Sequence, residues 1–334
     1  MSRGSNSSTK MGVFPLAAAT QVEYLSVQFQ TSSKMKIQSR RPSGVLVLFV
    51  AGALFLSGCK VLKSVNNFSN AAVGSLQNFE KLKASFTGEY VDLALFGQYG
   101  HFDGHFALTM DTPAAITRIQ TLALAEGTDS GLNKIYQSLN GYFAGLAKLA
   151  ADSLVEYQLD TLTAPLGGGA IIDTSKIKSS TIATTATIAG KLASAITGEY
   201  RLRHIKKYIA EANPLVKELA GAMSDALTSL DIKLDQRRQR LENSVFTPLL
   251  DSCSSPLERQ QVVSDYRQAM AGIQYERQQI ALYIQCLQVI SASHDYMEKN
   301  IDLLREKAVK LALGHYASQL KDLGSQFNKI KNQK

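Results

Sequence analysis

The chain has 334 residues and a formal net charge of +8, with 36 Lys and Arg against 28 Asp and Glu. Six of the basic residues and one acidic residue lie in residues 1–58, which leaves 30 basic and 27 acidic residues in the 276 that follow. A nearly balanced charge does not supply the concentrated basic face that nucleic acid requires, so we expect no nucleic-acid partner.

Residues 1–58 divide into two parts. Residues 1–34 are polar and rich in Ser and Thr, and we expect either a disordered extension or a misassigned start, with Met35 as the true first residue. From Met35, three basic residues (Lys36, Arg40 and Arg41) precede an apolar stretch over 44–56. As a helix that stretch measures roughly 20 Å, against about 30 Å of hydrocarbon in a bilayer. Residues 35–58 are therefore predicted to be a cleaved export signal.

The end of this segment, Leu56-Ser57-Gly58-Cys59, resembles the lipobox of bacterial lipoproteins. The resemblance implies that Cys59 is diacylated, that the preceding peptide is removed, and that the new amino terminus is also acylated. Two or more acyl chains hold a protein on a bilayer for long periods. Lys60 stands where an Asp would favour the inner membrane, so the resemblance implies the periplasmic face of the outer membrane. The alternative is a disordered tail and a chance apolar segment.

The first half of the remaining chain is predicted to be helical with interruptions. Residues 59–75 are rich in Asn and Ser and indicate a tether, followed by an N-terminal helical part over 76–212. Within that part, glycines and aromatic residues predict a turn-rich aromatic insert at 90–110. Asp111 and Pro113 are typical of a helix start, and we expect a helix to Ala125 and then a loop over 126–131.

A second amphipathic helix is predicted from Leu132 to about Thr163, because apolar residues recur there at spacings of three and four. Pro165 and the glycines at 167–169 would end it. Residues 164–198 are rich in small side chains, and their conformation stays open between helix and loop. Residues 201–207 are basic and amphipathic, which is typical of a solvated helix face and also suits an anionic membrane surface or an acidic partner.

A long helical hairpin is predicted over 214–323, followed by a polar tail over 324–334. Its first helix carries a seam of apolar residues at alternating spacings of four and three, which also contains Arg237 and Ser244. A second seam runs from Val262 to Leu311 through Ala308, with only Glu276 and His294 as interruptions. Ser255-Pro256-Leu257-Glu258 forms a capping box that starts the second helix after a turn over 248–255. A kink at 291–293 would fold this helix back.

The two remaining cysteines are predicted to be unpaired. If 256–286 is one helix, Cys253 and Cys286 lie roughly 45 Å apart, whereas a disulfide needs Cα atoms within about 7 Å. An intermolecular bridge through Cys253 is the alternative.

Few residues are candidates for chemistry. His101, Asp103 and His105 would share one side of a strand and are weak candidates for a metal site. Ser318 and Lys321 match the Ser-x-x-Lys pattern of penicillin-recognising enzymes, but the companion motifs are missing, so a solvated helix face is favoured. No catalytic residue and no cofactor are predicted, and Cys59 alone receives a role, as the site of lipidation.

The sequence therefore predicts an all-α protein, an elongated helical bundle with a long antiparallel hairpin that packs like a coiled coil. The expected function is that of a lipid-anchored, non-enzymatic lipoprotein of the cell envelope that binds or spaces another envelope component. Its partners would be the bilayer, through acylated Cys59, and an envelope protein or a second copy of itself. A membrane-acting bundle similar to the α-helical pore-forming proteins, and a metal-binding or hydrolytic envelope protein, are the alternatives.

Overall fold

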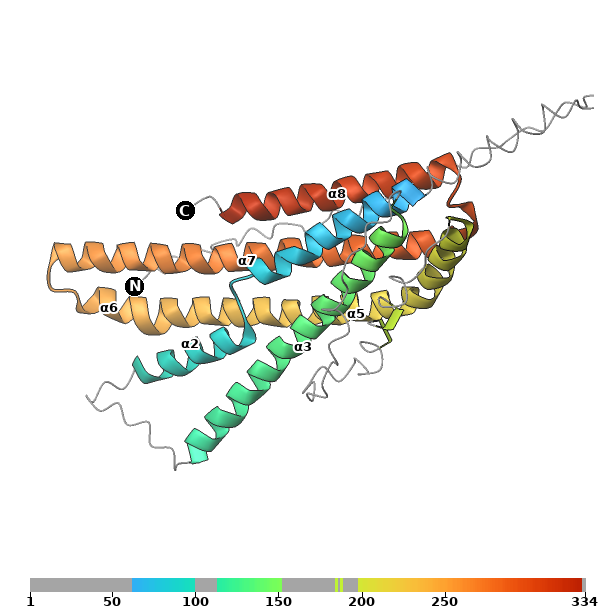
Figure 1. Cartoon of the computed structure of the whole chain (residues 1–334). Coiled ribbons are helices and arrows are strands. Elements are labelled where there is room, and N and C mark those ends of the chain that lie inside the picture. Colours follow the sequence, from blue (N-terminus) through green and yellow to red (C-terminus); the bar gives the residue numbers. More distant parts are fainter. Residues whose placement is uncertain (1–61, 100–112, 152–183, 186, 189–197, 332–334) are drawn as a thin grey trace, which may run out of the picture. The chain divides into compact units, whose positions relative to one another are not determined.

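The computed structural model describes residues 62–99, 113–151, 184–185, 187–188 and 198–331, and they form an all-α fold without a strand among them (Figure 1). This confirms the predicted fold class. A helix over 62–76 leads into the 3-10 helix η1 (Gln77–Lys81), and the helices α2 (Phe86–Tyr99) and α3 (Pro113–Leu149) follow. The second half contains α5 (Gly198–Arg240), a π-helical turn η2 (Leu241–Phe246), α6 (Thr247–Ser252), α7 (Pro256–Lys299), η3 (Ile301–Leu303) and α8 (Lys307–Lys331).

Helices α5 and α7 form the predicted antiparallel hairpin. Lys217 on α5 pairs with Asp295 late in α7, and Asp231 further along α5 pairs with Arg277 earlier in α7. The predicted seams are buried between them, with Val216, Ala220, Met223, Leu227, Leu230 and Leu234 on α5 and Ile273, Ile280, Tyr283, Leu287 and Ile290 on α7. The heptad spacing therefore identified the correct core faces of both helices.

The capping box at the start of α7 is also confirmed. The backbone N–H of Glu258 donates to Ser255 Oγ at 3.2 Å, and the N–H of Ser255 donates back to Glu258 Oε2 at 3.1 Å. The turn before it is shorter than predicted, because residues 247–252 form α6 and only 253–255 connect α6 to α7. Two donors that a helix start leaves without partners are thus satisfied within one short segment.

The second helix of the hairpin ends earlier than predicted. Helix α7 stops at Lys299, residues 300–306 form a connection that includes η3, and α8 packs back on α7. The chain folds back, but the reversal comes at 300–306 and not at the possible kink near 291–293, which lies inside α7. The connection also shifts the apolar register, so Ala308 and Leu311 are exposed while Val309, Leu313, Ala317 and Leu320 are buried.

The predicted tether over 59–75 is wrong where the structure describes it. Residues 62–76 are helical, and this helix buries Leu62, Val65, Phe68, Ala71, Ala72 and Leu76. Two of its polar residues bond to other helices: Asn66 Nδ2 donates to the carbonyl of Ala147 at 2.7 Å, and Ser75 Oγ donates to that of Leu320 at 3.1 Å. Asn and Ser here satisfy buried carbonyl groups, which composition alone does not show.

The predicted polar tail over 324–334 needs the same correction. Helix α8 continues to Lys331, and Phe327 is buried. Polar residues outnumber apolar ones in this last stretch, but one buried aromatic ring on the correct face is enough to hold it on the bundle.

Helix boundaries in the first half also differ from the prediction. Helix α3 runs unbroken through 126–131, where a loop was expected, and α2 occupies 86–99, where part of the turn-rich insert at 90–110 was expected. Asp129 on α3 connects these two differences. Its carboxylate accepts from the N–H groups of Phe86 and Thr87 at 2.9 Å each, and so it caps the start of α2. Such a long-range cap leaves no local sequence pattern.

Pro214 does not separate two domains as predicted, because it lies inside α5. A proline in a helix interior costs about 3 kcal/mol or more. The residues around it, Ala212, Asn213 and Val216, are buried, and their packing offsets that cost. The boundary between 76–212 and 214–323 is therefore not a structural boundary.

Both described cysteines are free, as predicted. Cys253 is half-buried beside the end of α6, and Cys286 is buried on α7. Burial raises the pKa of the Cys286 thiol to about 11, which keeps it protonated and unreactive at neutral pH.

Candidate functional site

The residues predicted to carry chemistry lie outside the described part of the chain. This holds for the lipidation candidate Cys59 and for the metal candidates His101, Asp103 and His105. Most of the small-residue segment 164–198 is also outside it. Within the described ranges there is no group of three or more His, Cys, Asp or Glu residues arranged to hold a metal ion. Nor is any described helix both long and apolar enough to cross a membrane.

His294, an interruption of the predicted seam, lies at the centre of a buried polar cluster. Tyr142 Oη on α3 lies 2.7 Å from His294 Nε2, and Asn213 Oδ1 on α5 lies 3.0 Å from His294 Nδ1. Because the amide oxygen of Asn213 can only accept, Nδ1 carries the proton and Nε2 accepts from the tyrosine hydroxyl. His294 is therefore a buried residue of the seam with both ring nitrogens hydrogen-bonded.

The cluster continues from Asn213 to charged groups nearer the surface. Asn213 Nδ2 donates to Asp295 Oδ1 at 3.3 Å, and Asp295 is paired with both Lys217 and Lys299. Hydrogen bonds from these two lysines hold the pKa of Asp295 well below its usual range. Burial lowers the pKa of His294 to about 3, so the ring is neutral at physiological pH. The cluster therefore joins α3, α5 and α7.

We expect the Tyr142→Phe variant to lose about 1–3 kcal/mol in its free energy of unfolding, because His294 Nε2 is then buried without a donor. Chemical denaturation of wild type and variant measures this. The matched control is Tyr266→Phe, since that half-buried ring lies near the hairpin turn and packs edge-on against Phe246. Equal losses of unfolding free energy in the two variants would mean that the hydrogen bond between Tyr142 and His294 does not stabilise the fold.

Arg237, which lies within the first seam, is the centre of a second polar cluster. It contacts Glu89 Oε1 at 2.7 Å and Asp92 Oδ2 at 2.6 Å on α2, and it also pairs with Glu276 on α7. The side chain of Arg237 is 15% exposed and that of Glu89 only 5%. Burial raises the pKa of Glu89 to about 7 despite the nearby guanidinium. One guanidinium thus holds three carboxylates and fastens α2 to the hairpin.

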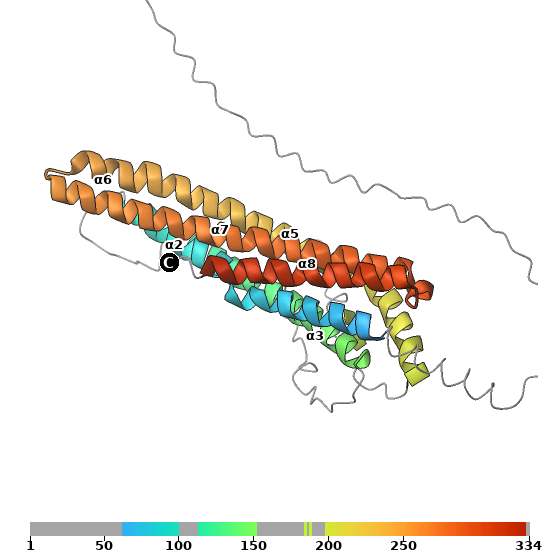
Figure 2. The same ribbon diagram turned by 90° about the horizontal axis from the view of Figure 1, so that it is seen from above.

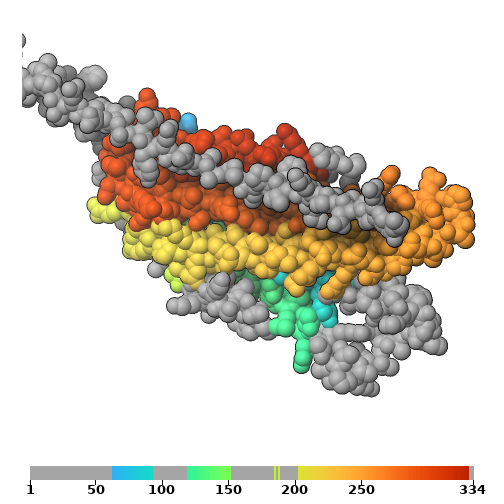
Figure 3. Space-filling view, turned by 180° about the vertical axis from the view of Figure 1, so that it is seen from behind, coloured from blue at the N-terminus to red at the C-terminus, as the bar shows by residue number. Residues whose placement is uncertain are grey.

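The end of the hairpin is different in character, because apolar side chains there are open to solvent. Leu249 on α6 is 46% exposed, and Leu257 at the start of α7 is 76% exposed. Helix α6 packs mainly on η2 and α7. Figure 3 shows the segment that contains α6 and the start of α7, in orange, at one end of the paired helices. We call α6 and residues 253–270 the hairpin end.

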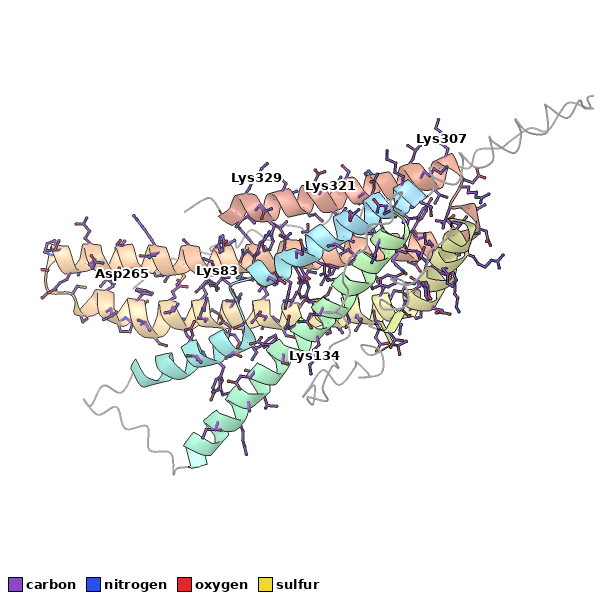
Figure 4. The ribbon with its side chains drawn as sticks, in the orientation of Figure 1. Lys83, Lys134, Asp265, Lys307, Lys321 and Lys329 are labelled. Carbon is purple, nitrogen blue, oxygen red and sulfur yellow. The ribbon has the colours of Figure 1, made fainter. Side chains whose placement is uncertain are left out.

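A shallow groove of about 600 Å³ lies between the helix over 62–76 and α8. Polar residues along its lining include Asn67, Asn70, Lys321, Asn328 and Lys329. Figure 4 labels Lys321 and Lys329 on α8. Ser318 and Lys321, which matched the Ser-x-x-Lys pattern, are both exposed on this helix. That arrangement agrees with the solvated helix face favoured from the sequence.

Comparison of this chain with known protein families, with curated proteins and with solved structures gives no match. The geometry of the described residues is thus the direct guide to function. It defines a class of protein: an all-α bundle whose buried polar groups join helices to one another, with exposed leucines at the end of its longest hairpin. Sequence reasoning missed Tyr142, Asn213 and Glu89 as members of these clusters, because they come from other helices.

Proposed function

We propose that this protein is a lipid-anchored, non-enzymatic lipoprotein of the cell envelope, at the periplasmic face of the outer membrane. Acylated Cys59 would be the anchor, and the hairpin end would bind another envelope component. The bundle between them sets the distance from the membrane to that partner. This protein would therefore act as a spacer and docking scaffold.

The observation that carries the proposal is the exposure of Leu249 and Leu257 at the end of a helical hairpin. The other half-buried apolar residues near them, among them Val245, Phe246 and Met270, belong to the same two-helix region. Burying one leucine contributes about 1.5–3 kcal/mol, so covering this surface with a partner would be favourable. Contiguous exposed apolar surface on a soluble domain commonly marks a docking site.

The position of the hairpin end supports the spacer role. Helix α7 has 44 residues, which corresponds to about 66 Å at 1.5 Å per residue. The hairpin end lies at the start of α7, and the connection over 300–306 lies at its other end. That connection is near the first described turn of the helix over 62–76 (Figure 2), and Leu62 is three positions after Cys59 in the sequence. An anchor at Cys59 would thus hold the hairpin end far from the bilayer.

The buried polar clusters support a non-enzymatic role. His294 is fully buried and bonded on both ring nitrogens, and Arg237 is engaged by three carboxylates. A general acid or base must reach a substrate proton within hydrogen-bond distance, and neither group has a free position for one. The polar chemistry of these described clusters is used within the fold.

The test is site-specific photocrosslinking in intact envelopes, with the photoreactive residue at position 257 and, as the control, at the exposed position Gln285 of the same helix. We expect one reproducible crosslinked species from position 257 and none from 285. Substituting Leu249→Asp should remove that species, because a carboxylate at the surface opposes apolar docking. Crosslinking that is equal at both positions would contradict a docking role for the hairpin end.

The anchor is tested separately in the same cells. We expect the wild-type protein to fractionate with the outer membrane and its amino-terminal peptide to carry the mass of two or three acyl chains. The Cys59→Ala variant should carry none. A wild-type chain without lipid would overturn the anchor and leave the docking result standing. Leakage of vesicles caused by the Cys59→Ala variant would instead favour the membrane-acting alternative.

A further inference from the structure

Two leucines are exposed at the end of the bundle opposite the hairpin end. Leu303 in η3 is 51% exposed, and Leu311 in the first turns of α8 is 64% exposed. Both lie in or beside the connection over 300–306. Exposed leucines next to a chain reversal are not required by the fold, since Ile301 and Leu304 already pack on the core there.

This end of the bundle also holds Leu62, the first residue after Cys59 that the structure describes. The helix over 62–76 and α8 run parallel, because Ser75 bonds to Leu320 and, further along both helices, Lys81 Nζ donates to Asn328 at 3.3 Å. The separation of 245 residues between Ser75 and Leu320, applied further back along both helices, brings Leu62 level with Lys307 at the start of α8. Figure 2 shows the first described turn of the blue helix beside the beginning of α8, and Figure 4 labels Lys307 at that position.

The reach of the chain limits how far the anchor can be from this surface. Leu62 is three positions after Cys59, and a fully extended chain covers at most about 3.6 Å per residue, which gives roughly 11 Å. If Cys59 is acylated as proposed above, Leu62 is therefore within about 11 Å of the bilayer interface. The neighbouring residues at 300–311 are then held close to the lipid headgroups.

Basic residues lie in the segments that meet at this end of the bundle. Lys63, Arg203, Arg305 and Lys307 are exposed and make no ion pair within the described part of the chain. Lys206 Nζ, 2.8 Å from Asp302, fastens the basic stretch at 201–207 of α5 to this connection. The acidic residues here are Asp302, which is paired with Lys206, together with Glu306 and Glu211, and they do not balance the basic ones. The surface is positive.

We propose that this anchor-end surface, defined by Lys63, Arg203, Leu303, Arg305, Lys307 and Leu311, lies on the anionic phospholipid surface of the membrane. This proposal rests on the proposed lipid anchor, and it adds a second attachment of the protein to the membrane. The leucine side chains enter the interface, and the lysine and arginine side chains meet lipid phosphates. Apolar insertion combined with basic residues is the pattern that binds peripheral proteins to anionic bilayers. Two attachments fix the orientation of the bundle, with α7 directed away from the membrane.

The absence of Trp from the sequence allows a direct test. The full chain is produced in its native envelope as Leu303→Trp, Leu311→Trp or, as the control at the hairpin end, Leu257→Trp. Each acylated protein is purified and reconstituted into vesicles of phosphatidylglycerol and phosphatidylcholine, with or without bromine on the acyl chains. We expect bromine to quench emission from positions 303 and 311, with a blue shift of the spectrum, and to leave position 257 unchanged.

Charge variants separate the contribution of the basic residues. In the Leu303→Trp background, Arg305→Glu with Lys307→Glu should abolish most of the quenching. The matched pair Arg259→Glu with Arg267→Glu, which are exposed on α7 near the hairpin end, should leave it intact. Vesicles of phosphatidylcholine alone should give weaker quenching than the anionic mixture.

Flotation and the mass of the amino-terminal peptide are measured on the same samples. Protein that carries lipid and floats with the vesicles, but shows equal quenching at positions 303, 311 and 257, would overturn the anchor-end surface and leave the anchor intact. Protein without lipid that fails to float would overturn the anchor, and the surface proposal with it. Quenching confined to positions 303 and 311 in floating protein supports both.

Discussion

The Arg237→Ala variant is expected to lose about 3–5 kcal/mol in its free energy of unfolding, because it leaves Glu89 buried without its cationic partner. Asp92 and Glu276 would then repel each other, and Glu89 would be either an unpaired buried carboxylate or a protonated one, depending on pH. Helix α2, which this arginine fastens to α5 and α7, is expected to become the least stable part of the described bundle. Denaturation followed by circular dichroism measures the loss, and hydrogen exchange over 86–92 locates it.

The matched control is Arg277→Ala. Arg277 also pairs with two carboxylates, Asp231 at 2.8 Å and Asp235 at 2.9 Å, but its side chain is 31% exposed. Pairs that are this accessible to water contribute about 0–1 kcal/mol. Equal losses from Arg237→Ala and Arg277→Ala would show that burial of the Arg237 cluster has no energetic consequence.

The Arg237→Ala loss is also expected to depend on pH. Glu89 already has a folded-state pKa of about 7, above its ordinary 4.5, so its favourable contribution is present below about pH 4.5 and is lost as pH rises through about 7. Removing Arg237 raises that pKa further. The variant should therefore lose more stability relative to wild type at about pH 8 than at about pH 5.

Acidification is expected to remove about 3 kcal/mol of stability through His294 between about pH 6.5 and pH 4. The folded-state pKa of His294 is lowered from 6.5 to about 3 by burial, so the unfolded chain takes up a proton in this range while the folded protein does not. The stabilising contribution is present above pH 6.5 and is lost as pH falls. Unfolding free energies measured at successive pH values test this.

Over part of this pH range, Glu89 changes the free energy of unfolding in the opposite direction to His294. A variant without His294 is therefore needed to isolate the contribution of the histidine. His294→Leu combined with Tyr142→Phe removes the imidazole together with the tyrosine hydroxyl that bonds to Nε2. The hydroxyl is therefore not left buried without a partner. This double variant is expected to lose less stability on acidification than wild type, by about 3 kcal/mol. Parallel pH curves for the two proteins would assign acid sensitivity to other groups.

The hairpin was predictable because its signals are local. Two apolar seams with a heptad spacing and the capping box at Ser255 and Glu258 depend on residues a few positions apart, and a short turn leaves antiparallel packing as the compact arrangement. The seams even contained the polar residues Arg237, Glu276 and His294. Antiparallel register brings Arg237 opposite Glu276, and that pairing was available from the two seams alone.

The partners from other helices were not predictable in the same way. Tyr142 lies 152 residues before His294, and Glu89 lies far from Arg237, so no spacing rule connects them. The helix over 62–76 was mistaken for a tether for a related reason. Asn66 and Ser75 are polar, and only the carbonyl groups of Ala147 and Leu320 on α3 and α8 make their burial favourable.

The sequence by itself determined that this protein is helical, that α5 and α7 pair as a hairpin, and that Cys253 and Cys286 are free. Periodicity, capping and helix length decide those features from neighbouring residues. Only the tertiary structure decided that α7 ends at Lys299, that residues 62–76 belong to the core, and which helices supply the partners of His294 and Arg237. A buried polar group is stable only with a partner in the correct place, and that place is set by the packing of helices distant in sequence.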